Sequence, residues 1–170
     1  ARDFMDAART RYPFPIKHLW QEEDRGFRKN VMLNRSIAVA EGEYLVFIDG
    51  DCIPHRHFLR RYARQGRRGE ALFGRRVMLN ERLSTQLLAH RNLDVLSYGR
   101  LLWQRGGDSL RYGLYLPFLT FYRREGIWGC NWGIRREHLV AVNGFDEDYV
   151  RAAIGEDTDI EWRLLRSGIK

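Results

Sequence analysis

An unbroken apolar run at residues 44–48 constrains the fold of this chain more than any other feature of its sequence. The run is bounded by Gly42 and Gly50, and five residues between turn formers are too few for a typical helix. Short apolar runs of this kind are typical of strands that are buried on both faces of a parallel sheet. Strand-like and helix-like segments alternate along the rest of the chain, which is the order of an α/β protein. We therefore expect a mainly parallel, Rossmann-like sheet flanked by helices.

The other expected elements follow from the spacing of apolar residues and from the positions of Gly and Pro. Gly42, Gly144 and Gly168 each follow an amphipathic stretch and are expected to end a helix. Helices are predicted near residues 1–11, 28–41, 58–62, 83–88, 136–142 and 158–166. Strands are predicted at residues 16–20, 44–48, 71–79 and 131–134.

The composition is that of a globular chain with an excess of positive charge. The 170 residues include 29 Lys and Arg against 22 Asp and Glu, and 44% are hydrophobic, which suffices for the core of one domain. This charge favours nucleic acid, an anionic membrane face or a phosphate-bearing small molecule as the partner. Arg pairs are scattered along the chain, without a helix-turn-helix, zinc-finger or RNP signature. We therefore expect no nucleic acid partner, and a basic nucleic-acid-binding module is the less favoured alternative.

The cysteines and the chain ends bear on where the protein works. Cys52 and Cys130 are too few for a disulfide scaffold and show no metal-site spacing, so we expect two reduced, partly buried thiols. No apolar run reaches 18 residues, and the chain opens without an initiator Met or an apolar leader. We expect an internal piece of a longer, cytoplasmic protein, with peripheral contact to the inner face of the plasma membrane as an alternative.

Two carboxylates directly follow the apolar run. Asp49 and Asp51 are separated only by Gly50, and ligands of open α/β sheets bind at the carboxyl ends of strands. Carboxylates are hard oxygen ligands, and Mg²⁺ or Mn²⁺ is commonly held by one or two of them together with substrate phosphates. The pattern therefore indicates a divalent metal site, although a simple polar turn would have the same sequence.

A second acidic cluster opens the last predicted helix. Residues 155–159 read Gly-Glu-Asp-Thr-Asp, and acids and Thr are favoured at a helix N-terminus for capping alone. Three acids in four positions exceed what capping requires. A cluster at a rigid helix start is also suited to hold a general base, and Asp157 is the candidate.

These two clusters belong to a longer series of motifs. The series comprises residues 20–28, Asn34 with its helix, and residues 42–54, 128–131, 143–147 and 155–159. In order and spacing it resembles the family 2 glycosyltransferases, which have the GT-A nucleotide-sugar-binding fold. The resemblance implies that the first strands are missing, roughly 40–60 residues by ordinary element and loop lengths. It divides one partial catalytic domain into a nucleotide- and metal-binding part (1–64), a variable connecting region (65–127) and an acceptor and catalytic-base part (128–170).

The resemblance implies roles for four residues at the nucleotide end. Asp24 and Arg28 would approach the nucleotide. Asp49 would contact the ribose or the metal-bound phosphate, and Asp51 would ligate a Mn²⁺ or Mg²⁺ ion that bridges the diphosphate, with Asp49 as a second candidate ligand.

It also implies roles at the sugar and acceptor end. Asp157 would be the catalytic base, and Glu156 would orient the acceptor hydroxyl. Trp128, Gly129 and Asn131 would line the donor-sugar pocket.

The implied function is an inverting transfer of a sugar from a nucleotide-diphosphate sugar, with UDP as the expected nucleotide, to a glycan or lipid-linked acceptor in surface-polysaccharide synthesis. A relative that binds sugars without catalysis is the alternative. The aromatic, Arg-flanked segment 110–124 is expected to be a core segment or the wall of the acceptor cleft, or else an interfacial element against an anionic leaflet.

Overall fold

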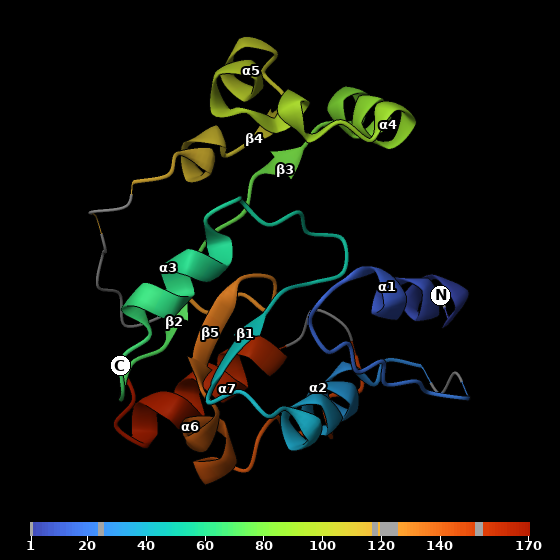
Figure 1. The fold of residues 1–170 in the computed structure, drawn as a ribbon. Helices are drawn as coiled ribbons and strands as arrows, with labels where there is room; N and C mark the ends of the chain where they lie inside the picture. The colour runs from blue at the N-terminus through green and yellow to red at the C-terminus, as the bar shows by residue number, and fades with distance from the viewer. Residues whose placement is uncertain (1, 24–25, 117–118, 120–125, 152–154) are drawn as a thin grey trace.

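The central strand of the larger sheet comes from the last third of the chain (Figure 1). This computed structural model describes residues 2–23, 26–116, 119, 126–151 and 155–170. β5 (Trp132–Arg135) lies between β1 (Tyr44–Phe47) and β2 (Leu72–Phe73). Leu45 pairs with Ile134 in β5, and Leu72 pairs with Gly133.

Both neighbours of β5 run antiparallel to it, so the prediction of a mainly parallel sheet is wrong for the described strands. The apolar run after Gly42 correctly marks β1, but its side chains are only half-buried. The doubly buried strand is β5, whose Trp132 and Ile134 are 1% and 0% exposed. A local apolar pattern reports burial and carries no information on the direction of a partner strand that is distant in sequence.

Three helices and the loops beside them enclose the core of this sheet. They are α2 (Lys29–Val39), α6 (Arg136–Ala141) and α7 (Glu156–Arg166). Phe47 stacks on Trp132 with ring centroids 4.7 Å apart, and Phe145 meets both rings edge-on. The predicted helices 28–41, 136–142 and 158–166 are confirmed with small shifts of their ends. The buried cluster consists of Ile37, Ile127, Trp132, Ile134, Leu139, Phe145, Ile160, Leu164 and Ile169.

Residues 78–113 form a separate group, which we call the lobe and which lies away from the larger sheet in Figure 1. Strands β3 (Met78–Leu79) and β4 (Gly107–Asp108) pair antiparallel at its base. Asn80 caps α4 (Glu81–His90) by accepting the backbone N–H of Leu83 at 2.9 Å. The lobe also contains α5 (Tyr98–Trp103) and two short 3-10 turns, η1 (Leu93–Leu96) and η2 (Leu110–Gly113).

Two predicted strands are corrected by the structure. Residues 16–20 form no strand, because no other segment pairs with their backbone within the described residues. The expected strand at 71–79 is divided between β2 and β3, which belong to different sheets. The N–H of Gly74 still donates to the backbone carbonyl of Asn131 at 2.9 Å. Beyond it the Asn131 side-chain amide fills the space beside Gly74 and donates to the carbonyl of Arg75, which ends the strand pairing.

The remaining helices are α1 (Arg2–Arg11) and α3 (Phe58–Gln65). Over the described parts of the chain, every helix is too short or too polar to cross a bilayer. Much of segment 110–124, which was proposed as an interfacial element, lies outside the described residues. Its first residues form η2.

Candidate functional site

The ammonium of Lys29 lies among acidic groups from two elements. Lys29 is the first residue of α2, and its Nζ lies 3.6 Å from Oδ1 of Asp49, which follows β1. The same Nζ lies 3.9 Å from Oε1 of Glu156, the first residue of α7. The two acidic clusters of the sequence therefore meet around one cation, which neutralises part of their charge.

Asp157 joins this group through the backbone at Gly129. The N–H of Gly129 donates to Oδ2 of Asp157 at 2.8 Å. A Cβ at Gly129 would lie 2.9 Å from Oδ1 of Asp157 and 2.9 Å from Nζ of Lys29. Glycine therefore lets the carboxylate and the ammonium both approach the main chain, and a larger residue would displace these two side-chain ends.

Burial and charge together set the proton affinity of Asp157. Its pKa is raised, first because burial penalises the ionised carboxylate and also because Glu156 and Asp49 are negative. The Gly129 N–H and the Lys29 ammonium oppose this shift. A carboxylate with a raised pKa is a stronger base than an ordinary surface Asp.

An open pocket of about 550 Å³ adjoins this carboxylate. Glu156, Asp157 and Thr158 of α7 form one wall, and Trp128 belongs to the opposite segment. Glu161 holds that segment by accepting the backbone N–H of Gly126 and of Ile127. The pocket therefore joins a candidate base to an exposed aromatic face, an arrangement suited to a sugar ring.

Two arginines lie over the Trp128 ring, and one of them also reaches Asp49. The guanidinium of Arg75 lies 4.5 Å from the centroid of the Trp128 ring, and that of Arg76 lies 5.7 Å from it. Nη1 of Arg76 is 4.0 Å from Oδ2 of Asp49. The sequence indicated Arg75 and Arg76 only as one of several scattered pairs. No sequence signal marked them, because the strand predicted at 71–79 placed both residues in its interior, whereas β2 ends at Phe73.

Asn30 and Asn34 of α2 hold the loop that leads toward α7. Asn34 donates to the carbonyl of Phe145 and accepts its N–H, both at 2.8 Å. Asn30, which is buried, donates to the carbonyl of Asp146 at 2.6 Å. Gly144 has a φ of +67°, and a Cβ there would strike Oδ1 of Asn34. The motif at 143–147 is therefore a structural clamp.

The third acid of the 155–159 cluster is also structural. Asp159 accepts from Nε and Nη2 of Arg163 at 2.8 and 2.6 Å. Nη1 of Arg163 donates to the carbonyls of Val142 and Gly144. Of the three acids in this cluster, Glu156 and Asp157 line the pocket.

The remaining predicted site residues are Asp24, Arg28, Asp51 and Asn131. Asp51 is exposed, and its Oδ1 is 3.6 Å from Sγ of Cys52. Arg28 is half-buried at the start of α2, and Asp24 lies outside the described residues. Asn131 accepts from the Tyr62 hydroxyl at 2.6 Å and donates to the Arg75 carbonyl at 3.1 Å, so its contact with a sugar stays a prediction.

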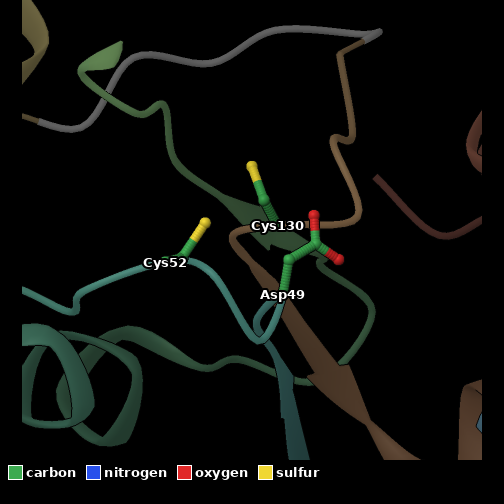
Figure 2. A group of neighbouring side chains, drawn as sticks. All are labelled: Asp49, Cys52 and Cys130. Atoms are coloured by element: carbon green, nitrogen blue, oxygen red, sulfur yellow. The ribbon is translucent and has the colours of Figure 1, made fainter. Parts of the chain in front are cut away.

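The donor atoms near the Asp49–Asp51 turn are of two kinds. The exposed Asp51 carboxylate has the hard oxygens that suit Mn²⁺ or Mg²⁺ bound together with a diphosphate, so it fits the expected metal. Asp49 instead comes together with Cys52 and Cys130, two thiols that the sequence indicated only as unrelated (Figure 2).

The family assignment rests on the part of the chain from its first residue through α6. A family model for Glycosyl transferase family 2 matches residues 1–142. The chain belongs to this family. No curated protein matches it significantly.

Family membership makes the chain a glycosyltransferase in general, with a nucleotide-sugar donor and an acceptor as partners. Its α/β arrangement agrees with the GT-A fold of the family in class, although the described strands are antiparallel. The matched range contains the nucleotide-end residues and Trp128–Asn131 but ends before Glu156 and Asp157. Their assignment therefore depends on the geometry given above.

Proposed function

We propose that this chain is the catalytic part of an inverting glycosyltransferase that moves a sugar from a UDP-sugar to a glycan or lipid-linked acceptor. The observation that supports it best is the position of Asp157, a half-buried carboxylate of raised pKa that lines the pocket and is oriented by the Gly129 N–H. We expect the enzyme to work in the cytoplasm, with peripheral contact to the inner face of the plasma membrane as the alternative that a lipid-linked acceptor would favour.

At the acceptor end, Asp157 takes the proton of the attacking hydroxyl. The acceptor oxygen then forms a bond to the anomeric carbon while the bond from that carbon to the diphosphate oxygen breaks. One direct displacement inverts the anomeric centre. Glu156, buried beside Lys29 at the start of α7, orients the acceptor hydroxyl.

At the donor end, Trp128 and Gly129 border the sugar, and Asn131 is the further candidate. Trp128 offers a ring face backed by Arg75, which suits the apolar face of a sugar. Asp49, Arg28 and Asp24 approach the nucleotide.

The leaving group requires positive charge. Mn²⁺ or Mg²⁺ held by Asp51, with Asp49 beside it, would neutralise the charge that develops on the departing diphosphate. Arg76, close to Asp49, adds a fixed positive charge at the same end.

Two substitutions separate these roles in the full-length protein. Asp157→Asn is expected to reduce transfer by about 10²–10⁴-fold, the usual worth of a general base, while UDP binding stays nearly unchanged. Asp51→Ala is expected to weaken UDP binding only when Mn²⁺ is present. Calorimetric titration of UDP with Mn²⁺ and with EDTA, together with a transfer assay, measures both effects.

Asp108→Asn is the matched control, because Asp108 is an exposed acid in the lobe. It should bind and transfer like the wild type. Equal loss of UDP binding in Asp157→Asn and Asp51→Ala would contradict the division of roles. Full transfer by Asp157→Asn would remove the base assignment.

A further inference from the structure

Two cysteines and one aspartate converge beside the nucleotide end of the site. One ligand atom from each of Asp49, Cys52 and Cys130 lies within 4.8 Å of the other two. Cys130 is buried, and Cys52 and Asp49 are half-buried. Figure 2 shows that the two sulfurs and the carboxylate border one common space, although they come from segments that are far apart in the sequence.

The backbone holds these three residues in place independently of any ligand. Cys52 donates its N–H to the carbonyl of Asp49 at 3.1 Å, which closes the turn after β1. Cys130 lies in the turn before β5, where the N–H of Asn131 donates to the carbonyl of Trp128 at 3.0 Å. Because β1 and β5 are paired strands, their ends bring the two turns together.

The kind of donor atom identifies the cation. Two sulfurs and one carboxylate oxygen are a set for borderline-soft Zn²⁺, whereas Mg²⁺ and Mn²⁺ prefer oxygen alone. Zn–S bonds of about 2.3 Å and Zn–O bonds of about 2.0–2.2 Å place tetrahedral ligand atoms roughly 3.3–3.8 Å apart. The three atoms therefore need to approach by up to about 1.5 Å, a distance within the range of side-chain rotation.

We propose that Asp49, Cys52 and Cys130 form a zinc-binding site with a fourth position open to water. It shares Asp49 with the Mn²⁺ or Mg²⁺ position at Asp51, differs from that position in its two sulfur ligands, and does not depend on the proposed function. Zinc bound there displaces the two thiol protons and draws the Asp49 carboxylate away from Lys29 and Arg76.

The test uses the full chain, stripped of metal with a chelator and kept reduced with a phosphine, with both thiols titrated beforehand. Zn²⁺ alone is added in a calorimeter, in the absence of nucleotide. One Zn²⁺ per chain is expected, with release of protons. Co²⁺ replaces Zn²⁺ as a spectroscopic probe and should give a near-ultraviolet band from thiolate coordination.

Three variants identify the ligands. Cys52→Ser, Cys130→Ser and Asp49→Asn should each lower the zinc affinity by at least about tenfold, and both Cys variants should weaken the Co²⁺ band. Asp108→Asn should leave affinity and spectrum unchanged. Cys130 is buried, so its replacement could impair folding; the half-exposed Cys52 and the wild-type Co²⁺ spectrum make the test independent of that variant. A wild-type spectrum without the thiolate band, or a Cys52→Ser affinity equal to that of wild type, would overturn the proposal.

Discussion

The sheet with its three helices and the lobe at 78–113 are built differently. Around β5, side chains such as Trp132, Ile134 and Ile160 are almost entirely buried, and α2, α6 and α7 are linked by side chains that bond to backbone. In the lobe only Leu83, Leu101 and Gly106 are buried, while Leu88 and Trp103 are 78% and 90% exposed.

Many hydrogen bonds of the lobe are local. Asn80, for example, bonds to Leu83, Gly106 and Arg105. The comparison indicates that the sheet and its helices determine the geometry of the site, whereas the lobe is a separately organised insertion. The candidate catalytic and donor residues that the structure describes all lie outside the lobe.

The largest expected effect on stability distinguishes the buried cluster around β5 from the few buried residues of the lobe. Trp132→Ala is expected to lower the free energy of unfolding by about 3–5 kcal/mol, because it removes a fully buried ring stacked on Phe47. Leu101→Ala should instead increase amide hydrogen exchange within 78–113 and leave exchange in β5 unchanged. Equal exchange changes in β5 for both variants would mean that the lobe and the sheet unfold as one unit.

The clamp between α2 and the 143–147 loop should have the next largest effect. Asn34→Ala removes the partners of both backbone groups of Phe145 and should cost about 1–3 kcal/mol in denaturant unfolding. Ser36→Ala on the exposed side of the same helix should change stability by less than about 0.5 kcal/mol. If the two variants are equally stable, the loop is held by other contacts.

A smaller effect should depend on pH. The pKa of Asp157 is raised in the folded protein, so the folded state holds this proton more tightly than the unfolded state does. As pH rises from the ordinary Asp range through the raised pKa, the wild type should lose stability relative to Asp157→Asn. Denaturation midpoints of both proteins across that range measure the difference. A constant difference would show that Lys29 and Gly129 cancel the effect of burial on the pKa, and a change in favour of the wild type would show that they outweigh it.

The smallest effect is expected at the lobe surface. Trp103→Ala should alter the melting temperature very little, within about 0.5 kcal/mol in stability, because the ring is almost fully exposed. Transfer activity should also be unchanged. A clear loss of activity with an unchanged melting temperature would mean that this surface contributes to acceptor binding. It would contradict the conclusion that the functional residues lie outside the lobe.

Much of the sheet region was predictable from local patterns. Gly42 and the apolar run located β1, and Gly144 and Gly168 located the ends of α6 and α7 within a few residues. The direction of pairing was not predictable, because it is set by β5, which lies far along the chain. The strand expected at 71–79 failed for a related reason: the side chain of Asn131 interrupts it from a distant segment.

The acidic residues of the candidate site could be predicted from the sequence, but the position of Lys29 between them could not. Asp49 and Asp157 stand out by their motifs, whereas Lys29 occupies an ordinary helix start, and nothing nearby in sequence indicates that two acidic clusters meet there. The convergence of Cys52 with Cys130 was equally hidden, because it depends on the pairing of β1 with β5.

The clamp by Asn30 and Asn34 has a mechanical consequence. Helix α2 has 11 residues and is about 16 Å long at 1.5 Å of rise per residue. Its first residue provides the ammonium between Asp49 and Glu156, and its next two turns grip the loop leading toward α7. The helix therefore connects the Lys29 ammonium to the 143–147 loop through one rigid element. A displacement of α2 along its axis would shift the ammonium and the gripped loop together, so thermal motion would preserve their relative positions.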